Sequence, residues 1–254
     1  MPGWRWSGRL GWWRSGLRGS ELMQSSELSK PKSLAFRGVR RMGITVVVLA
    51  FLLFVPAGTL RFWEAWAYLG LQGGFWAYFF LYFLKHDPEL SERRLQSKES
   101  EPQQKLAIRL FSAVLWVGFI LIGLDHRLQW SHPRPSLALI VTTQVVVVAG
   151  YWIVFWVMKT NTFASSVIRV ESGQRVIDTG PYAWVRHPMY TGMAVTALAT
   201  PIALGSYVAL PVFALMIPVL GYRLIHEERL LCRDLAGYSE YCGKTRYRLV
   251  PGIW

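Results

Sequence analysis

The residue types best suited to chemistry gather in the last third of the chain, beside its apolar stretches. Ionisable side chains this close to hydrocarbon are costly, so they are functional candidates by default. They fall into five groups: the loop 174–182, the turn 186–190, Arg223, the pair Glu227-Glu228, and the aromatic and basic tail 241–254. Together they favour a ligand that is charged at one end and apolar at the other.

Each group offers a different contact to such a ligand. Backbone N–H groups of the loop, which contains Gly180 and Pro181, could hold a carboxylate or the polar groups of adenosine. Tyr182 and Tyr190 could stack on a purine, and the acidic pair could bind ribose hydroxyls or an ammonium group. A lipid partner would enter sideways between helices.

Each group also has a purely structural explanation. Arg223 and Glu227 are four residues apart and could form an ion pair along a helix, in the less favourable order. His187 could be an interfacial residue at a helix start, with Pro188 in the first turn. The aromatic residues of the tail could form a belt at the membrane interface. For single residues, these alternatives stay open.

The elements that must position these groups are membrane-spanning helices. Apolar residues make up 52% of the 254 residues, which include 13 Trp, and they occur in blocks. At ~20 residues per span, these blocks predict four transmembrane helices and, in the longest block, a tight helical hairpin that turns between Pro201 and Pro211. The blocks are residues 42–60, 65–84, 110–124, 135–158 and 187–222. The fold class is therefore all-α, a polytopic membrane protein of about six transmembrane helices, the last two forming the hairpin.

The distribution of basic residues predicts the orientation. With the N-terminus inside, all of the 28 Lys and Arg residues except Arg61, Arg127 and Arg134 fall on the cytosolic side. We therefore expect an integral, multi-pass membrane protein whose two termini and active site face the cytosol. The net charge of +13 is explained by topology and contact with membrane lipids. It does not indicate nucleic acid, since no nucleic-acid-binding module surrounds the basic residues.

Three regions follow from these features. Residues 1–41 are a basic cytosolic extension, expected to be disordered; residues 42–158 hold four transmembrane helices; residues 159–254 carry the candidate chemistry. Within the middle region, residues 85–105 are expected to be a solvated connector, with a helix end at Asp87-Pro88 and a new helix after Pro102. Cys232 and Cys242 are expected to be free thiols on the inner side, so neither a disulfide framework nor a metal site is predicted.

The C-terminal third, residues 169–254, resembles the isoprenylcysteine carboxyl methyltransferase family, which is grouped with the membrane phospholipid methyltransferases. Three blocks carry the resemblance, in the family's order: VIDTGPYAWVRHPMYTG, RLIHEERLL and GYSEYCGKTRYRLVPGIW. Residues 1–158 are similar only in being transmembrane helices. The resemblance implies transfer of a methyl group from S-adenosylmethionine to an acceptor embedded in the membrane.

The resemblance also implies roles for single residues. Arg223 would face the acceptor as the catalytic residue. The loop reads Gln174-Arg175 where eukaryotic members tend to have other polar residues, so backbone contacts are expected there. The residues implied to bind S-adenosylmethionine are Gln174, Arg175, Val176, Ile177, Tyr182, His187, Pro188, Met189, Tyr190 and Glu227.

The implied reaction needs alignment of its two reactants more than it needs a general base. A sulfonium methyl donor is already activated, and a carboxylate is already ionised at neutral pH. Arg223 could hold that carboxylate with two donors, so the favoured acceptor is a carboxylate such as prenylcysteine, entering from the bilayer. Two alternatives stay open: phospholipid N-methylation, which a cation beside the acceptor disfavours, and a non-enzymatic scaffold or transporter that retains the fold.

Overall fold

The computed structural model describes residues 31–96, 102–163 and 174–254, and the regular structure within these ranges is entirely helical. The predicted all-α fold is thus confirmed. The helices are α2 (Pro31–Ala57), α3 (Trp63–His86), α4 (Pro88–Gln96), α5 (Pro102–Leu128), α6 (Leu137–Thr160), the 3-10 turn η1 (Gly180–Ala183), α7 (Pro188–Ala203), α8 (Leu210–Ala214), α9 (Met216–Asp234) and α10 (Tyr238–Lys244).

Within the described ranges, four helical segments are long and apolar enough to cross a membrane: Leu34–Ala57, Gln104–Leu128, Leu137–Thr160 and Leu210–Asp234. Large apolar side chains on these segments are exposed, as expected of surfaces that face lipid. α3 also has 24 residues, but α7 has only 16, fewer than the ~20 that cross a hydrocarbon core. The chain is therefore a polytopic membrane protein, and the total of six spans stays a prediction.

Two parts of the chain differ from what the sequence led us to expect. α2 begins at Pro31, so residues 31–41 of the expected disordered extension are helical, while residues 1–30 lie outside the described part. The expected solvated connector contains α4, whose Leu90 is fully buried. α4 packs against α2 and α3, and Arg37 Nη2 lies 3.5 Å from Glu92 Oε1. These packing partners explain why a polar segment becomes an ordered helix.

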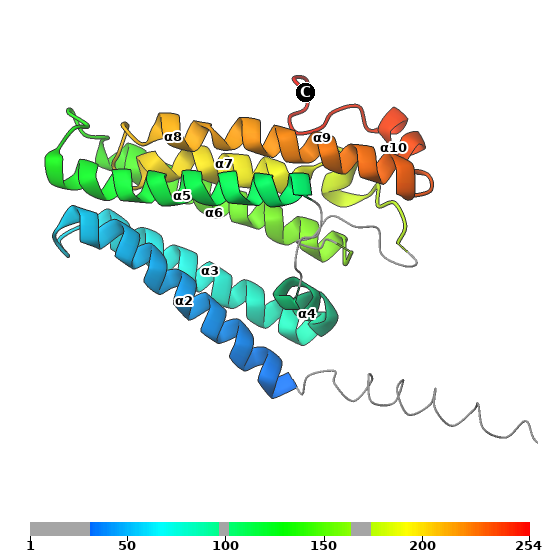
Figure 1. Cartoon of the computed structure of the whole chain (residues 1–254), viewed down its shortest axis with the longest axis horizontal. Coiled ribbons are helices and arrows are strands. Elements are labelled where there is room, and N and C mark those ends of the chain that lie inside the picture. The colour runs from blue at the N-terminus through cyan, green and yellow to red at the C-terminus, as the bar shows by residue number, and fades with distance from the viewer. Residues whose placement is uncertain (1–30, 97–101, 164–173) are drawn as a thin grey trace, which may run out of the picture.

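In the view of Figure 1, α2, α3 and α4 lie below α5 to α9, and α2 packs against both α3 and α5. The largest core lies between these helices and includes Leu53 of α2, Ile122 of α5 and Phe213 of α8. α6 and α7 approach each other closely where Gly150 of α6 faces Gly192 of α7. A Cβ atom on Gly150 would lie only 2.9 Å from the carbonyl oxygen of Gly192. This close packing fixes α7, which carries several of the predicted site residues.

The predicted hairpin is present, with α7 running out and α8 and α9 running back. The chain reverses in residues 204–209, where Gly205 adopts a φ of +77° that favours glycine. Ser131 fastens this turn to the neighbouring loop: its Oγ accepts from the Tyr207 N–H at 2.8 Å and donates to the buried Asp125 at 2.6 Å. The start of α7 and the end of α9 therefore meet at the opposite end of the bundle, together with α4 and α10 (Figure 1).

Candidate functional site

A cavity of about 280 Å³ lies at the end of the bundle where α4, α7, α9 and α10 meet. All the residues that were assigned to a site from the sequence line it: Gln174, Arg175, Val176, Ile177, Tyr182, His187, Pro188, Met189, Tyr190, Arg223 and Glu227. The remaining lining residues were not assigned: Arg94, Asn161, Phe163, Arg186, Met193, Leu231, Leu235, Tyr238 and Tyr241. Residues separated by more than half the length of the chain therefore share one cavity.

Tyr190 connects Arg223 and Glu227, the two α9 residues that were assigned to acceptor and donor. Its hydroxyl donates to the Glu227 carboxylate and accepts from Arg223 Nε, which lies 3.0 Å away. The two α9 residues are about one helical turn apart and so project from the same face toward the first turn of α7. Pro188 begins that turn. Tyr190 belongs to the same turn, and its side chain is buried. Arg223 and Glu227, whose spacing suggested an ion pair along the helix, are thus linked through the Tyr190 hydroxyl.

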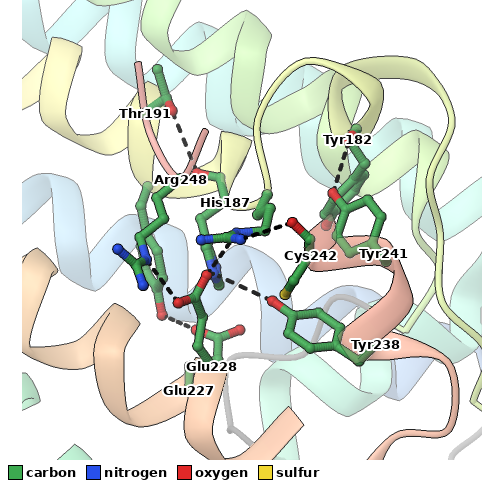
Figure 2. A network of polar contacts seen from close by, with 11 residues as sticks. Tyr182, His187, Thr191, Glu227, Glu228, Tyr238, Tyr241, Cys242 and Arg248 are labelled. Carbon is green, nitrogen blue, oxygen red and sulfur yellow. Dashed lines mark hydrogen bonds and ion pairs between the residues drawn. The ribbon is translucent and has the colours of Figure 1, made fainter. Parts of the chain in front are cut away.

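Glu228, the next residue, forms a separate and buried ion cluster (Figure 2). Its Oε1 lies 2.8 Å from Arg186 Nε and 3.3 Å from His187 Nε2, and its Oε2 accepts from Arg248 Nε at 2.8 Å. The hydroxyl of Tyr238 lies 3.5 Å from the same His187 nitrogen. One carboxylate therefore joins the start of α7, the end of α9 and the C-terminal tail. Of the two glutamates, only Glu227 was assigned to the donor from the sequence, and the buried ion cluster around Glu228 was not predicted.

The tail after α10 is held across the start of α7. The backbone N–H of His187 donates to the carbonyl oxygen of Arg248 at 2.9 Å, and Thr191 Oγ1 donates to that of Leu249 at 2.7 Å. The Arg248 guanidinium also lies over the Trp254 ring, 5.4 Å from its centroid. The tail thus supports the cavity wall that carries His187, a role beyond that of a membrane-interface belt.

Tyrosines form the side of the cavity nearest the loop. The Tyr182 hydroxyl accepts from Asn161 Nδ2 at 3.0 Å, and the Tyr241 hydroxyl donates to the Tyr182 carbonyl oxygen at 2.7 Å. Burial raises the pKa of Tyr182 to about 12 and also raises the pKa of Tyr238 and of Tyr241. These phenols are neutral at physiological pH. They provide an uncharged aromatic lining suited to a purine or to a sulfonium cation.

Arg94 of α4 lines the cavity, although its segment was expected to be a solvated connector. Its Nη2 lies 3.8 Å from the sulfur of Met189, and burial lowers the pKa of Arg94 to about 10, so the side chain is charged at neutral pH. Leu90, one turn earlier on α4, is buried against Phe83 and Phe155. That buried leucine in a polar segment is the sequence signal that could have indicated that α4 docks.

The fold and the cavity define a polytopic helical membrane protein with a pocket of polar and apolar groups at one end of its helices. Residues 140–233 match the model of the Isoprenylcysteine carboxyl methyltransferase (ICMT) family, so the predicted resemblance to this family is confirmed over that region. The matched region contains most of α6, nearly all of the hairpin and most of the cavity-lining residues.

Two individual proteins are also similar. The chain is 26% identical over 162 residues to the Delta(14)-sterol reductase TM7SF2 of Mus musculus, a match that covers 57% of this chain and 38% of that protein. The chain thus spans well under half the length of this relative. Among solved structures, it is similar to the eukaryotic intramembrane Ras methyltransferase ICMT, with a TM-score of 0.49 and 16% sequence identity. That comparison covers 93% of this chain and 85% of the other.

Proposed function

We propose that this chain is an S-adenosylmethionine-dependent methyltransferase that acts on a lipophilic carboxylate, such as prenylcysteine, embedded in the membrane. The observation that carries the proposal is the charge of the cavity. Within the described residues, its lining includes Arg94, Arg175, Arg186 and Arg223 but a single carboxylate, that of Glu227. Such a pocket at the end of membrane-spanning helices suits an anionic acceptor whose apolar part stays in the bilayer.

The donor would lie between the loop 174–182 and the first turn of α7. Backbone groups of Gln174 to Ile177 would contact its polar atoms, and the neutral ring of Tyr182 would stack on its purine. Glu227 would accept from ribose hydroxyls or from the ammonium group of the donor, while Tyr190 fixes the orientation of the carboxylate. His187, Pro188 and Met189 complete this side of the cavity.

Arg223 would orient the acceptor carboxylate. One carboxylate oxygen forms a bond to the methyl carbon while the carbon–sulfur bond breaks, and the electron pair of that bond stays on sulfur. The products are a methyl ester and S-adenosylhomocysteine, and no proton is transferred, so the site needs no general base. Because sulfur loses its positive charge in the transition state, an uncharged lining favours reaction over tight binding of the ground-state donor.

Two observations bear on alternatives. Phospholipid N-methylation would use the same donor, but the attacking nitrogen gains positive charge, which the Arg223 guanidinium would oppose. The mouse relative is by name a sterol reductase, and a reductase would bind a hydride donor in place of a sulfonium compound. A scaffold or transporter with this fold would bind neither.

The donor is the part of the proposal that can be tested without knowing the physiological acceptor. Protein purified in detergent is titrated by calorimetry with S-adenosylmethionine, with S-adenosylhomocysteine and with NADPH. We expect saturable binding of the first two compounds and none of the third. Binding of NADPH alone would contradict the proposal in favour of a reductase, and binding of none of them would favour a scaffold.

A further inference from the structure

The cavity receives two guanidinium groups from different elements, one on each side of the first turn of α7. Arg223 comes from α9 and contacts Tyr190, with Nε 3.0 Å from the hydroxyl. Arg94 comes from α4 and contacts the preceding residue, with Nη2 3.8 Å from the sulfur of Met189. Successive residues of a helix point ~100° apart, so the two cations approach the cavity from different directions.

Arg94 shares the cavity with Tyr182, the tyrosine of the loop. Burial is the largest influence on the pKa of Arg94 and of Tyr182, and each of the two groups also shifts the pKa of the other. Asn161 fixes the hydroxyl of Tyr182 from α6, with its Nδ2 3.0 Å away.

Contacts near both ends of α4 fix this helix and so the position of Arg94. Leu90 is fully buried in the apolar cluster that also includes Phe83 and Phe155. At the other end, the carbonyl oxygen of Leu95 accepts from Arg41 Nη1 of α2 at 3.3 Å. A cation on such a helix is positioned before a ligand binds, which lowers the entropic cost of the contact.

The other two arginines of the lining are less suited to ligand binding. Arg186 Nε lies 2.8 Å from the Glu228 carboxylate and is largely buried there. Arg175 is exposed to solvent, where an ion pair contributes little. Arg94 and Arg223 are therefore the arginines best placed to hold an anion inside the cavity.

We propose that Arg94 binds the α-carboxylate of S-adenosylmethionine and so leaves Arg223 to the carboxylate of the acceptor. This inference rests on the function proposed above, in which donor and acceptor each bring one carboxylate into the same cavity. If both anions used Arg223, each would compete with the other for the same two donors. Two arginines that approach the α7 turn from different directions remove that competition. Arg94 is thus a donor-binding residue supplied by a segment outside the region that resembles methyltransferases.

The test compares S-adenosylmethionine with its decarboxylated analogue, which lacks only the α-carboxylate. Their affinities are measured by calorimetry for the wild type, for Arg94→Gln and for Arg229→Gln, an exposed arginine of α9 that does not line the cavity. The wild type and Arg229→Gln are expected to bind the complete donor about 10-fold or more tightly than the analogue. Arg94→Gln is expected to bind both compounds with affinities within about threefold of each other, because only the contact with the carboxylate is lost.

The preference is a ratio of two affinities for one protein sample, so a smaller folded fraction does not change it. If Arg94→Gln lowered the affinity for both compounds by the same factor, Arg94 would only shape the cavity and the inference would be wrong. Unchanged donor affinity with a raised KM for the acceptor would assign Arg94 to the acceptor and would also overturn it. A wild type that binds neither compound would instead contradict the proposed function itself.

Discussion

At the scale of single residues, the two adjacent glutamates of α9 have different partners. Glu227 lines the cavity and accepts from the Tyr190 hydroxyl, whereas Glu228 is buried against Arg186, His187 and Arg248. A step of one residue along a helix turns the side chain by ~100°, which is enough to separate a contact with ligand from a contact within the protein. Substitutions at the two positions should therefore affect different properties.

Glu227→Ala is expected to weaken S-adenosylmethionine binding by about 1–3 kcal/mol, because a charge-assisted hydrogen bond to the donor is lost. Glu228→Ala is expected to lower the free energy of unfolding by roughly 2–4 kcal/mol, because the Arg186 and Arg248 cations lose their shared carboxylate. Calorimetry with the donor and thermal melting in detergent measure the two effects. The division of roles would be wrong if both variants changed donor affinity and melting temperature alike.

The residues lining the cavity could be predicted from the sequence where ionisable and aromatic side chains lie beside apolar stretches, and the resemblance supplied their separate roles. The blocks around Tyr182, His187 and Glu227 lie within that resemblance, and their side chains do share one cavity. Arg94 is outside it, and its place depends on docking of α4 against α2 and α3. The contact of Glu228 with Arg248 likewise depends on where the tail lies, which helical periodicity on α9 does not specify.

At the scale of elements, the close contact of α6 and α7 positions the first turn of α7 and so the cavity. The contact exists because Gly150 and Gly192 let the two backbones approach, as small residues do between transmembrane helices. Apolar blocks and prolines predicted the helix end at Asp87, the start at Pro102 and the hairpin, because all three are local signals. The start of α2 and the whole of α4 depend on contacts between distant segments, so local signals missed them.

Gly150→Ala is expected to lower the free energy of unfolding by about 1–3 kcal/mol through overpacking. The added Cβ would lie 2.3 Å from Thr196 Oγ1 and 2.9 Å from the Gly192 carbonyl oxygen, and the backbone carbonyl cannot rotate away. Gly43→Ala on α2 is the matched control, since its Cβ would meet no atom within 4 Å. Thermal melting in detergent should show a lower transition temperature for Gly150→Ala alone. Equal transitions for both variants would show that the contact is not tight.

At the scale of the whole molecule, the cavity lies at the end of the bundle that holds most of the basic residues in the described ranges. Arg61, Arg127 and Arg134 belong to the opposite end, where Arg134 Nη1 lies 3.8 Å from the buried Glu64 carboxylate. Because basic residues are retained in the cytosol, we propose that the cavity and both termini face that side. S-adenosylmethionine would then reach the cavity from the cytosol, and the acceptor would reach it from the bilayer.

Labelling of single cysteines in intact cells checks this orientation. In a background with Cys232 and Cys242 replaced by Ser, Ser239→Cys on α10 should be protected from an impermeant thiol reagent until the cells are lysed. Arg61→Cys, in the loop between α2 and α3, should be labelled from outside. Both target positions are exposed in the structure, so a difference between them reports the side of the membrane. Labelling of Ser239→Cys from outside would place the cavity on the outer side of the membrane and would contradict the proposed orientation.

Arg223 decides which acceptor the cavity suits. Arg223→Lys keeps the charge but loses the planar pair of donors, so methylation of a carboxylate should fall while donor affinity stays nearly constant. With Arg223→Ala, methylation of a carboxylate should fall further, because the carboxylate would enter the cavity without that cation. An amine acceptor predicts no such fall, since the nitrogen gains positive charge as the new bond forms and a nearby cation opposes it.

Methyl transfer to a carboxylate is measured most directly with methyl-labelled S-adenosylmethionine, given together with either a farnesylated cysteine analogue or phosphatidylethanolamine. We predict that the wild type labels the cysteine analogue as a base-labile methyl ester, that Arg223→Lys labels it less and that Arg223→Ala labels it least. Phosphatidylethanolamine should stay unlabelled. Labelling of phosphatidylethanolamine alone, or full activity of Arg223→Ala on the cysteine analogue, would contradict carboxyl methylation and leave Arg223 as a structural partner of Tyr190.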